Sequence, residues 1–116
     1  MQDEYRERVH DYWNRASCGT EHTKYKKFSV DYFNDIEHRR YTVEPEIFSF
    51  AQFTRYRNQK IVEVGVGAGT DFVQWVRAGA KAYGVDLTQE AIDNTRNRLA
   101  LEGLEAEHLS VADAEL

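Results

Sequence analysis

Three glycines at alternate positions lie between two carboxylates in the short segment VEVGVGAGTDF. The glycines are Gly65, Gly67 and Gly69, and the carboxylates are Glu63 and Asp71. Because glycine has no Cβ, its backbone adopts positive φ and allows a ligand to lie directly against the chain. The same property also allows a helix to pack closely on a strand. The segment therefore predicts either a ligand-binding turn or a tight connection, and its neighbours decide between the two.

The chain after Asn58 alternates between strand-like and helix-like segments. The expected elements are a strand at 60–64, a helix from Thr70 to Gly79, a strand at 82–86, a helix that follows the N-cap Thr88 and ends before Gly103, and a strand at 106–111. The side chains expected to face inward from the two helices are Phe72, Val73, Val76, Ile92, Leu99 and Ala100. This alternation is typical of right-handed parallel crossovers in an α/β fold.

The first half of the chain is predicted to be helical and is rich in aromatic residues. Helices are expected at 3–15, after the N-cap Ser29, and from Pro45 onward. Their apolar stripes are Tyr5, Val9, Tyr12 and Trp13 in the first helix, Val30, Phe33, Ile36 and Tyr41 in the second, and Ile47, Phe48, Ala51 and Phe53 in the third. We therefore interpret residues 1–58 as a helical cap or lid and residues 59–116 as the α/β part.

The residues around the glycine turn favour a particular class of ligand. In an α/β fold this turn lies at the carboxyl edge of the sheet, where ligands bind. Thr70 stands where a dinucleotide fingerprint requires Gly or Ala, so the nicotinamide pattern fails. Glu63 would repel a pyrophosphate but suits an ammonium group, and Asp86 ends the second strand, where a carboxylate accepts hydrogen bonds from ribose hydroxyls. An amino acid joined to a nucleoside without phosphate satisfies all three conditions.

Residues 61–116 resemble the first half of class I S-adenosylmethionine-dependent methyltransferases. VEVGVGAGTD is similar to the first motif of that family, YGVDLT to its ribose-binding motif, and VADAEL to the adenine-side motif after the third strand. The resemblance implies a three-layer Rossmann-like fold that binds the cofactor S-adenosyl-L-methionine. The helical first half also resembles the caps of bacterial small-molecule methyltransferases, through YW, CGT and RRY.

The resemblance also implies which residues meet each part of the cofactor. Glu63 and the backbone of Gly65 and Gly67 would contact the amino-acid portion, Asp86 the ribose hydroxyls, Leu87 the adenine face, Asp113 the adenine amino group, and the Ala114 N–H the ring, with Gly69 in the same turn. The further candidates are Tyr12, Trp13, Tyr41, Thr70 and Asp71. The three aromatic residues would stabilise the sulfonium by cation–π attraction, although packing of the core or lid is the alternative for each.

The family's sheet has seven strands, whereas this chain ends just after the third. The expected fold is thus the Rossmann-like methyltransferase fold truncated after the third parallel strand, with strand order 3-2-1. This order puts the strand at 60–64 at an edge, where Ile61, Val62 and Val64 lie beside unpaired backbone groups. We expect a homodimer or a sheet-completing partner at this edge, and little turnover from this chain alone.

The composition excludes several classes of protein. The 116 residues are 41% hydrophobic and 30% charged, as in an ordinary globular domain. Residues 1–60 carry 11 Lys and Arg against 10 Asp and Glu, and residues 61–116 carry 4 against 10, which argues against a nucleic-acid footprint. No segment approaches the roughly 20 apolar residues of a membrane span. One cysteine, Cys18, and no apolar leader favour a cytoplasmic protein.

No residue is assigned as catalytic. His10, His22 and His38 each have the chemistry of a general base, but none has an identifiable partner. Cys18 and His22 have a metal-like spacing without further ligands nearby, so no metal site is predicted. The expected function is methylation of a small-molecule acceptor. The alternative is a non-catalytic module that serves oligomerisation or binding.

Overall fold

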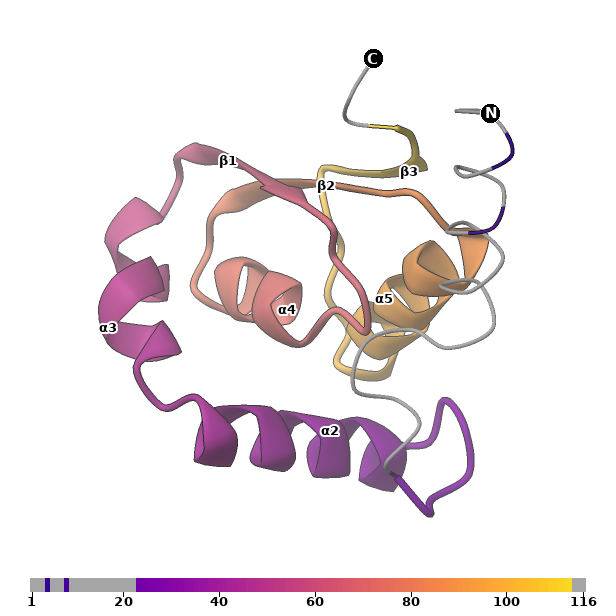
Figure 1. Cartoon of the computed structure of the whole chain (residues 1–116). Helices are drawn as coiled ribbons and strands as arrows, with labels where there is room; N and C mark the ends of the chain where they lie inside the picture. Colours follow the sequence, from indigo (N-terminus) through magenta and orange to yellow (C-terminus); the bar gives the residue numbers. More distant parts are fainter. Residues whose placement is uncertain (1–3, 5–7, 9–22, 114–116) are drawn as a thin grey trace.

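The computed structural model describes residues 4, 8 and 23–113 (Figure 1). The helices and strands in this part are α2 (Val30–Val43), α3 (Ile47–Ala51), the 3-10 helix η2 (Phe53–Tyr56), β1 (Lys60–Val64), α4 (Thr70–Arg77), β2 (Lys81–Asp86), α5 (Gln89–Leu101) and β3 (His108–Val111). The helix expected at 3–15 lies outside the described residues except at positions 4 and 8, and Tyr12, Trp13 and Ala114 are also outside them.

The three strands form one parallel sheet in the order β1-β2-β3. This is the expected order 3-2-1 read from the opposite edge, and it places β1 at one edge of the sheet. In the register, Val62 lies opposite Tyr83, and Gly84 lies opposite Leu109. The predicted α/β class with parallel crossovers is therefore confirmed.

One face of the sheet is covered by α4 and α5 (Figure 1). Phe72 and Val73 of α4, with Ile92 and Leu99 of α5, are buried against Ala82 of β2 in a single cluster. The position of Gly84 reflects this packing, since a Cβ there would lie 2.8 Å from both the Phe72 ring and the Leu109 side chain. The amphipathic patterns of the two helices thus specify which face they cover.

Two of the predicted helix starts, those capped by Ser29 and Thr88, agree with the observed geometry. The Ser29 side chain accepts a hydrogen bond from the Tyr32 N–H at 3.1 Å, and that of Thr88 accepts one from the Ala91 N–H at 3.1 Å. Each bond satisfies one of the backbone donors that a helix leaves unpaired in its first turn. Gly79 adopts positive φ (89°) just after α4, as expected for a helix end.

Four expectations for individual residues are wrong. Val30 is 54% exposed, because helical geometry places it outside the buried stripe of α2. Pro45 lies in a turn, and α3 begins two residues later at Ile47. Phe48 is 48% exposed rather than inward-facing, and Ala100 is exposed beside the buried Leu99. These errors fall at element ends, where small rotations change which side chains are covered.

The cap helix α2 does not cover the second face of the sheet. It packs against α4 and α5, and Figure 1 places it beyond these helices as seen from the sheet. On the other face, Val62 and Val64 are 68% and 62% exposed. Within residues 23–113, therefore, no helix covers this second face of the sheet. No helix among the described residues is long and apolar enough to cross a membrane.

Candidate functional site

The glycine turn between β1 and α4 requires positive φ at all three of its glycines, with values of 78° at Gly65, 57° at Gly67 and 79° at Gly69. The three glycines nevertheless differ in what surrounds them. A Cβ at Gly65 would meet nothing within 4 Å, whereas one at Gly69 would lie 2.8 Å from Thr95 Oγ1. Gly69 is thus needed for close packing against α5, and Gly65 borders open space. The glycine pattern therefore allows close packing at Gly69 and leaves room for a ligand at Gly65.

Asp86, the last residue of β2, joins this turn to the start of α5. Its Oδ2 accepts a hydrogen bond from the Gly67 N–H at 3.0 Å, and its Oδ1 accepts one from the Thr88 N–H at 3.0 Å. The Thr88 hydroxyl adds a third, longer contact to Oδ1 at 3.4 Å. A carboxylate has about four acceptor positions, so these contacts leave limited capacity for a ligand, mainly at Oδ2. Leu87, which follows it, is half-buried. Asp86 is therefore a structural anchor that remains able to accept further bonds.

Glu63 projects from β1 toward the helix-covered face. Its Oε1 accepts a hydrogen bond from Trp75 Nε1 at 3.1 Å. Burial raises the pKa of the Glu63 carboxyl to about 8, with smaller contributions from the charges of Asp71 and Asp86, while Trp75 and Arg40 act in the opposite direction. A carboxyl group in this state stays largely protonated at neutral pH until a cation arrives. Glu63 is thus suited to pair with a bound ammonium group.

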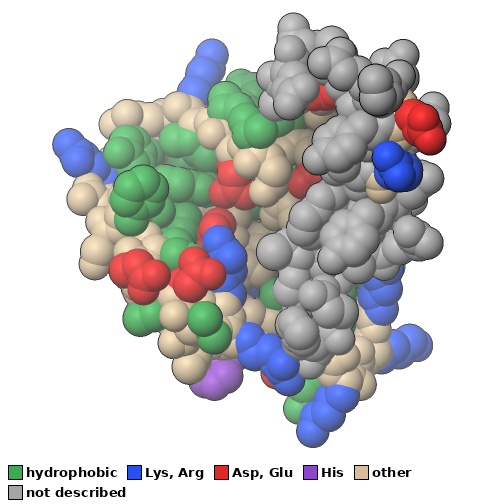
Figure 2. Space-filling view, in the orientation of Figure 1, with side chains coloured by type: hydrophobic (Ala, Val, Ile, Leu, Met, Phe, Trp, Pro, Cys, Tyr) green, Lys and Arg blue, Asp and Glu red, His purple; other side chains and the backbone are tan. Residues whose placement is uncertain are grey.

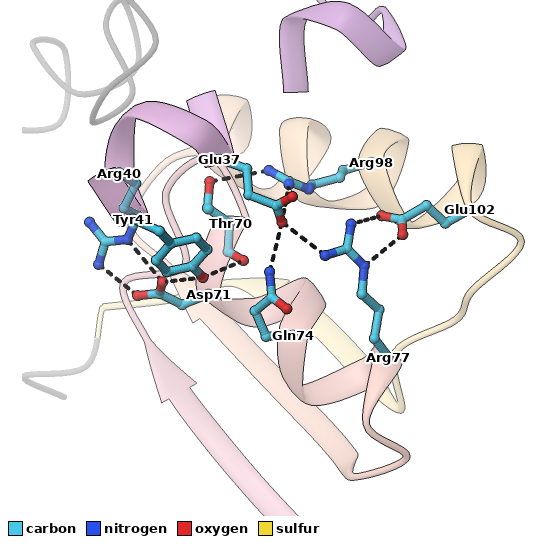
Figure 3. Close-up of polar contacts among 9 residues, drawn as sticks. All are labelled: Glu37, Arg40, Tyr41, Thr70, Asp71, Gln74, Arg77, Arg98 and Glu102. Atoms are coloured by element: carbon cyan, nitrogen blue, oxygen red, sulfur yellow. Dashed lines mark hydrogen bonds and ion pairs between the residues drawn. The ribbon is translucent and has the colours of Figure 1, made fainter. Parts of the chain in front are cut away.

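Asp71, in the first turn of α4, is bound by the cap helix (Figure 3). Arg40 Nε lies 2.9 Å from Asp71 Oδ1, and Arg40 Nη2 lies 2.6 Å from Asp71 Oδ2. The Tyr41 hydroxyl lies 2.9 Å from Asp71 Oδ1 and 3.1 Å from the Thr70 carbonyl, and its single proton serves these two acceptors. The side chains of Asp71 and Tyr41 therefore contact each other, and they do not project solely into an open cavity.

Sequence reasoning missed a second set of contacts, centred on Arg98. This side chain is 2% exposed, and it donates to Thr70 Oγ1 and to Glu37 Oε1, both at 3.1 Å. Burial lowers the pKa of its guanidinium. The same Glu37 oxygen accepts from Gln74 and Arg77 (Figure 3). The sequence contained a signal that Arg98 is buried, because Arg98 follows Ala91 and Thr95 along the inward stripe of α5.

A cleft of about 590 Å³ lies between α2 and the glycine turn. The described residues that line it are Ile36, Arg39, Arg40, Val43, Glu44, Glu63, Val64, Gly65, Val66, Gly67, Ala68, Thr70 and Asp71. Figure 2 shows acidic and basic side chains next to hydrophobic ones over the part of the molecule where Figure 1 places the end of β1. The cleft therefore offers charges of both signs beside an apolar wall.

The predicted site residues divide into two groups at the carboxyl edge of the sheet. Five of them line the cleft: Glu63, Gly65, Gly67, Thr70 and Asp71. Asp86, Leu87 and Asp113 lie along the same edge, at the ends of β2 and β3, without lining it. Asp113 is held near Asp86 because the Ala112 N–H donates to the Asp86 carbonyl at 2.8 Å.

Neither of the two histidines with described positions, His38 and His108, lines the cleft. His38 is exposed on α2 and does not line it, and Cys18, His10 and His22 lie outside the described residues. Among the residues with described positions, no three His, Cys, Asp or Glu side chains gather to hold a metal ion.

Comparisons of the chain with protein-family models, with curated proteins and with solved structures find no match. The chemistry of the site therefore rests on its own geometry and on the motifs in the sequence.

Proposed function

We propose that this chain is the cofactor-binding part of an S-adenosylmethionine-dependent methyltransferase that acts on a small molecule. One observation carries the proposal. Glu63, Asp86 and Asp113 lie at the carboxyl ends of three neighbouring parallel strands, around a turn whose glycines all have positive φ. Three carboxylates around a backbone cradle suit a ligand rich in hydrogen-bond donors and poor in negative charge.

The amino-acid end of the cofactor fits the cleft. Its ammonium group would pair with Glu63, a largely buried carboxyl group that makes no hydrogen bond to a cationic side chain among the described residues. The backbone at Gly65 borders open space, so the ligand can approach it closely. A dinucleotide would instead place a pyrophosphate here, beside Glu63, whose side chain offers no positive charge to bind it.

The nucleoside end would lie along the edge toward β3. Asp86 would bind the ribose hydroxyls, mainly through Oδ2, which accepts only the Gly67 N–H among the described contacts. Leu87 would pack on adenine, and Asp113 would accept from the adenine amino group. The anchoring of Asp86 by the Gly67 and Thr88 N–H groups supports this role, because a carboxylate held in place loses little entropy on binding.

The chain's own contribution to methyl transfer would be orientation and exclusion of water. Displacement at a sulfonium methyl group by a nucleophile needs an in-line approach, and positioning of the reactants supplies much of the rate enhancement. Ile36, Val43 and Val64 give the cleft an apolar lining near the place where the sulfonium would lie. No catalytic base is assigned.

Calorimetric titration tests the proposal directly. S-adenosylhomocysteine should bind the 116-residue chain, and NAD should not, because only NAD would place a pyrophosphate beside Glu63. Binding of NAD with equal or higher affinity would contradict the assignment of the ligand class. Absence of S-adenosylhomocysteine binding by the folded chain would contradict the proposed function itself.

A second candidate function, a non-catalytic module for oligomerisation or binding, is favoured by the edge of β1. The Gln59 carbonyl and the Gly65 N–H both bond to β2. Since a parallel strand directs alternate residues to alternate sides, the backbone groups of Val62 and Val64 point to the open edge. These groups invite pairing with a second copy or with a sheet-completing partner. Light scattering distinguishes such an assembly from a monomer.

A further inference from the structure

Four residues join the cap to the start of α4, and we call them the latch: Arg40 and Tyr41 of α2, and Thr70 and Asp71 of α4. The guanidinium of Arg40 binds both oxygens of Asp71, at 2.9 and 2.6 Å (Figure 3). The Tyr41 hydroxyl lies within hydrogen-bond distance of the Asp71 carboxylate and of the Thr70 carbonyl. Paired bonds of this kind fix orientation as well as distance.

The latch acts at the end of the glycine turn. Thr70 follows Gly69 directly, and its hydroxyl also accepts a bond from the buried Arg98. A segment with three glycines has more backbone freedom than a segment of the same length without glycine, and ordering it costs free energy. Contacts that hold the next two residues from α2 and from α5 therefore restrict the turn to the conformation seen here.

The latch also fixes one wall of the cleft. The same cleft that has Glu63 and Gly65 on one side has Ile36, Arg39 and Val43 of α2 on the other. Arg40 and Asp71 join the two walls directly, with Nη2 and Oδ2 2.6 Å apart. Ring contact between Tyr41 and Phe48, with centroids 4.4 Å apart, joins the end of α2 to α3.

We propose that Arg40 and Tyr41 are positioning residues for cofactor binding, which hold the glycine turn and the α2 wall at the spacing that the ligand requires. Asp71 then serves as the attachment point for the cap, and Glu63 remains to meet the ammonium group. This inference rests on the proposed function for the identity of the ligand, while the structural part of it concerns the turn alone.

Two variants and a matched control test the proposal in the full 116-residue chain. Arg40→Gln removes the paired ion contact, and Tyr41→Phe removes only the hydroxyl and keeps the ring. The control is Arg77→Gln, because the side chains of Arg77 and Arg40 are 33% and 34% exposed, and Arg77 also joins α4 to α2, but at the far end of α4. Calorimetry with S-adenosylhomocysteine and hydrogen exchange of amides 65–70 are measured for each.

Arg40→Gln should raise the Kd for S-adenosylhomocysteine about tenfold. This is the change expected if the conformation of the glycine turn that binds the ligand falls to about one tenth of the population. Tyr41→Phe should raise it by a smaller factor, and Arg77→Gln should leave it unchanged. Without ligand, amides 65–70 should exchange faster in the two latch variants than in the control.

The proposal would be overturned if folded Tyr41→Phe had the same Kd and the same amide exchange as the wild type. It would also be overturned if Arg77→Gln lost as much affinity as Arg40→Gln. If the wild-type chain does not bind S-adenosylhomocysteine, the proposed function fails, and the exchange measurement alone decides the latch. Faster exchange confined to the turn would then support it, and unchanged exchange would refute it.

Discussion

The two faces of the sheet contrast sharply. On the face beneath α4 and α5, Ala82 of β2 is 1% exposed and Phe72 of α4 is fully buried. On the opposite face, Val62 and Val64 of β1 are 68% and 62% exposed. Strand β1 is thus apolar toward the open face, as is typical of parallel sheets covered on both faces, whereas β3 directs His108 and Ser110 to that face. The sequence of β1 is therefore that of a strand covered on both sides, and helices of the described residues supply one cover.

The covered face changes character along its length. Near the start of the strands it carries the core, and at their carboxyl ends it carries Glu63 and Asp86. Glu63 shares a side of β1 with Ile61, and Asp86 shares a side of β2 with Ala82 and Gly84. The same helices that bury the apolar positions thus partly bury the carboxylates and hold them in place. The candidate site is the polar end of the core.

The largest effect is expected from breaking the covered face. Phe72→Ala would remove a ring that is 0% exposed and would leave a cavity against Val66, Gly84 and Leu109. Such substitutions cost about 3–5 kcal/mol, a large part of the stability of a small domain. Denaturant unfolding measures the change. Phe50→Ala is the control, because Phe50 is 91% exposed, and its effect should stay within about 0.5 kcal/mol.

The next effect concerns the polar end of this face. Asp86→Ala should weaken S-adenosylhomocysteine binding by about 1.5–3 kcal/mol, the range for hydrogen bonds to a charged group. The loss has two sources, because Asp86 would bind the ribose and already holds the Gly67 N–H. Calorimetry measures it, with Asp93→Ala as a control whose carboxylate binds Gln89 within α5. Equal affinity in wild type and Asp86→Ala would remove Asp86 from the ribose role.

The sequence predicted the covered face well, because its determinants are local. Ser29 and Thr88 cap helices as expected, and the buried pair Phe72 and Val73 follows from helical spacing. The alternation of strands and helices predicted the parallel sheet, and the strand order implied by the family resemblance predicted that β1 lies at an edge. The glycine pattern located the turn, although it could not tell that Gly69 serves contact with α5 while Gly65 borders open space.

The contacts between distant segments could not be predicted in the same way. Arg40 and Asp71 are far apart in the chain, and so are Glu37 and Arg98. Charged residues of these types are common on solvated helix faces, so nothing local distinguishes a paired arginine from an exposed one. The position of Arg98 on the inward stripe of α5 was the one usable signal. The latch required the tertiary arrangement.

A smaller effect is expected from the titration of Glu63. Its pKa is raised from 4.5 to about 8, so between these values the folded state holds a proton that the unfolded state has lost. The stability of the wild type should therefore fall as pH rises toward 8. We expect a loss of about 2 kcal/mol between pH 6 and 8, because one proton changes the stability by at most about 1.4 kcal/mol per pH unit.

Denaturant unfolding at several pH values measures this slope, and Glu63→Gln should lack it. Binding of an ammonium ligand would favour the ionised carboxyl group, so S-adenosylhomocysteine binding at pH 7 should release up to about one proton. Calorimetry in buffers of different ionisation enthalpy detects this release. A stability slope and a proton release that are the same in Glu63→Gln and wild type would show that another group titrates.

The smallest effect on stability is expected at the open face. Val62→Thr and Val64→Thr together keep the branched shape of the side chains and the β-propensity of the strand, while they replace exposed methyl groups with hydroxyls. Because both valines are more than half exposed, unfolding of the monomer should change by about 0.5 kcal/mol or less. Association should respond differently. If a second copy pairs with β1, the valines lie in the contact, and the double variant should shift light scattering toward the monomer. Unchanged association would place the contact elsewhere, and a large loss of monomer stability would mean that this face is already covered within the chain.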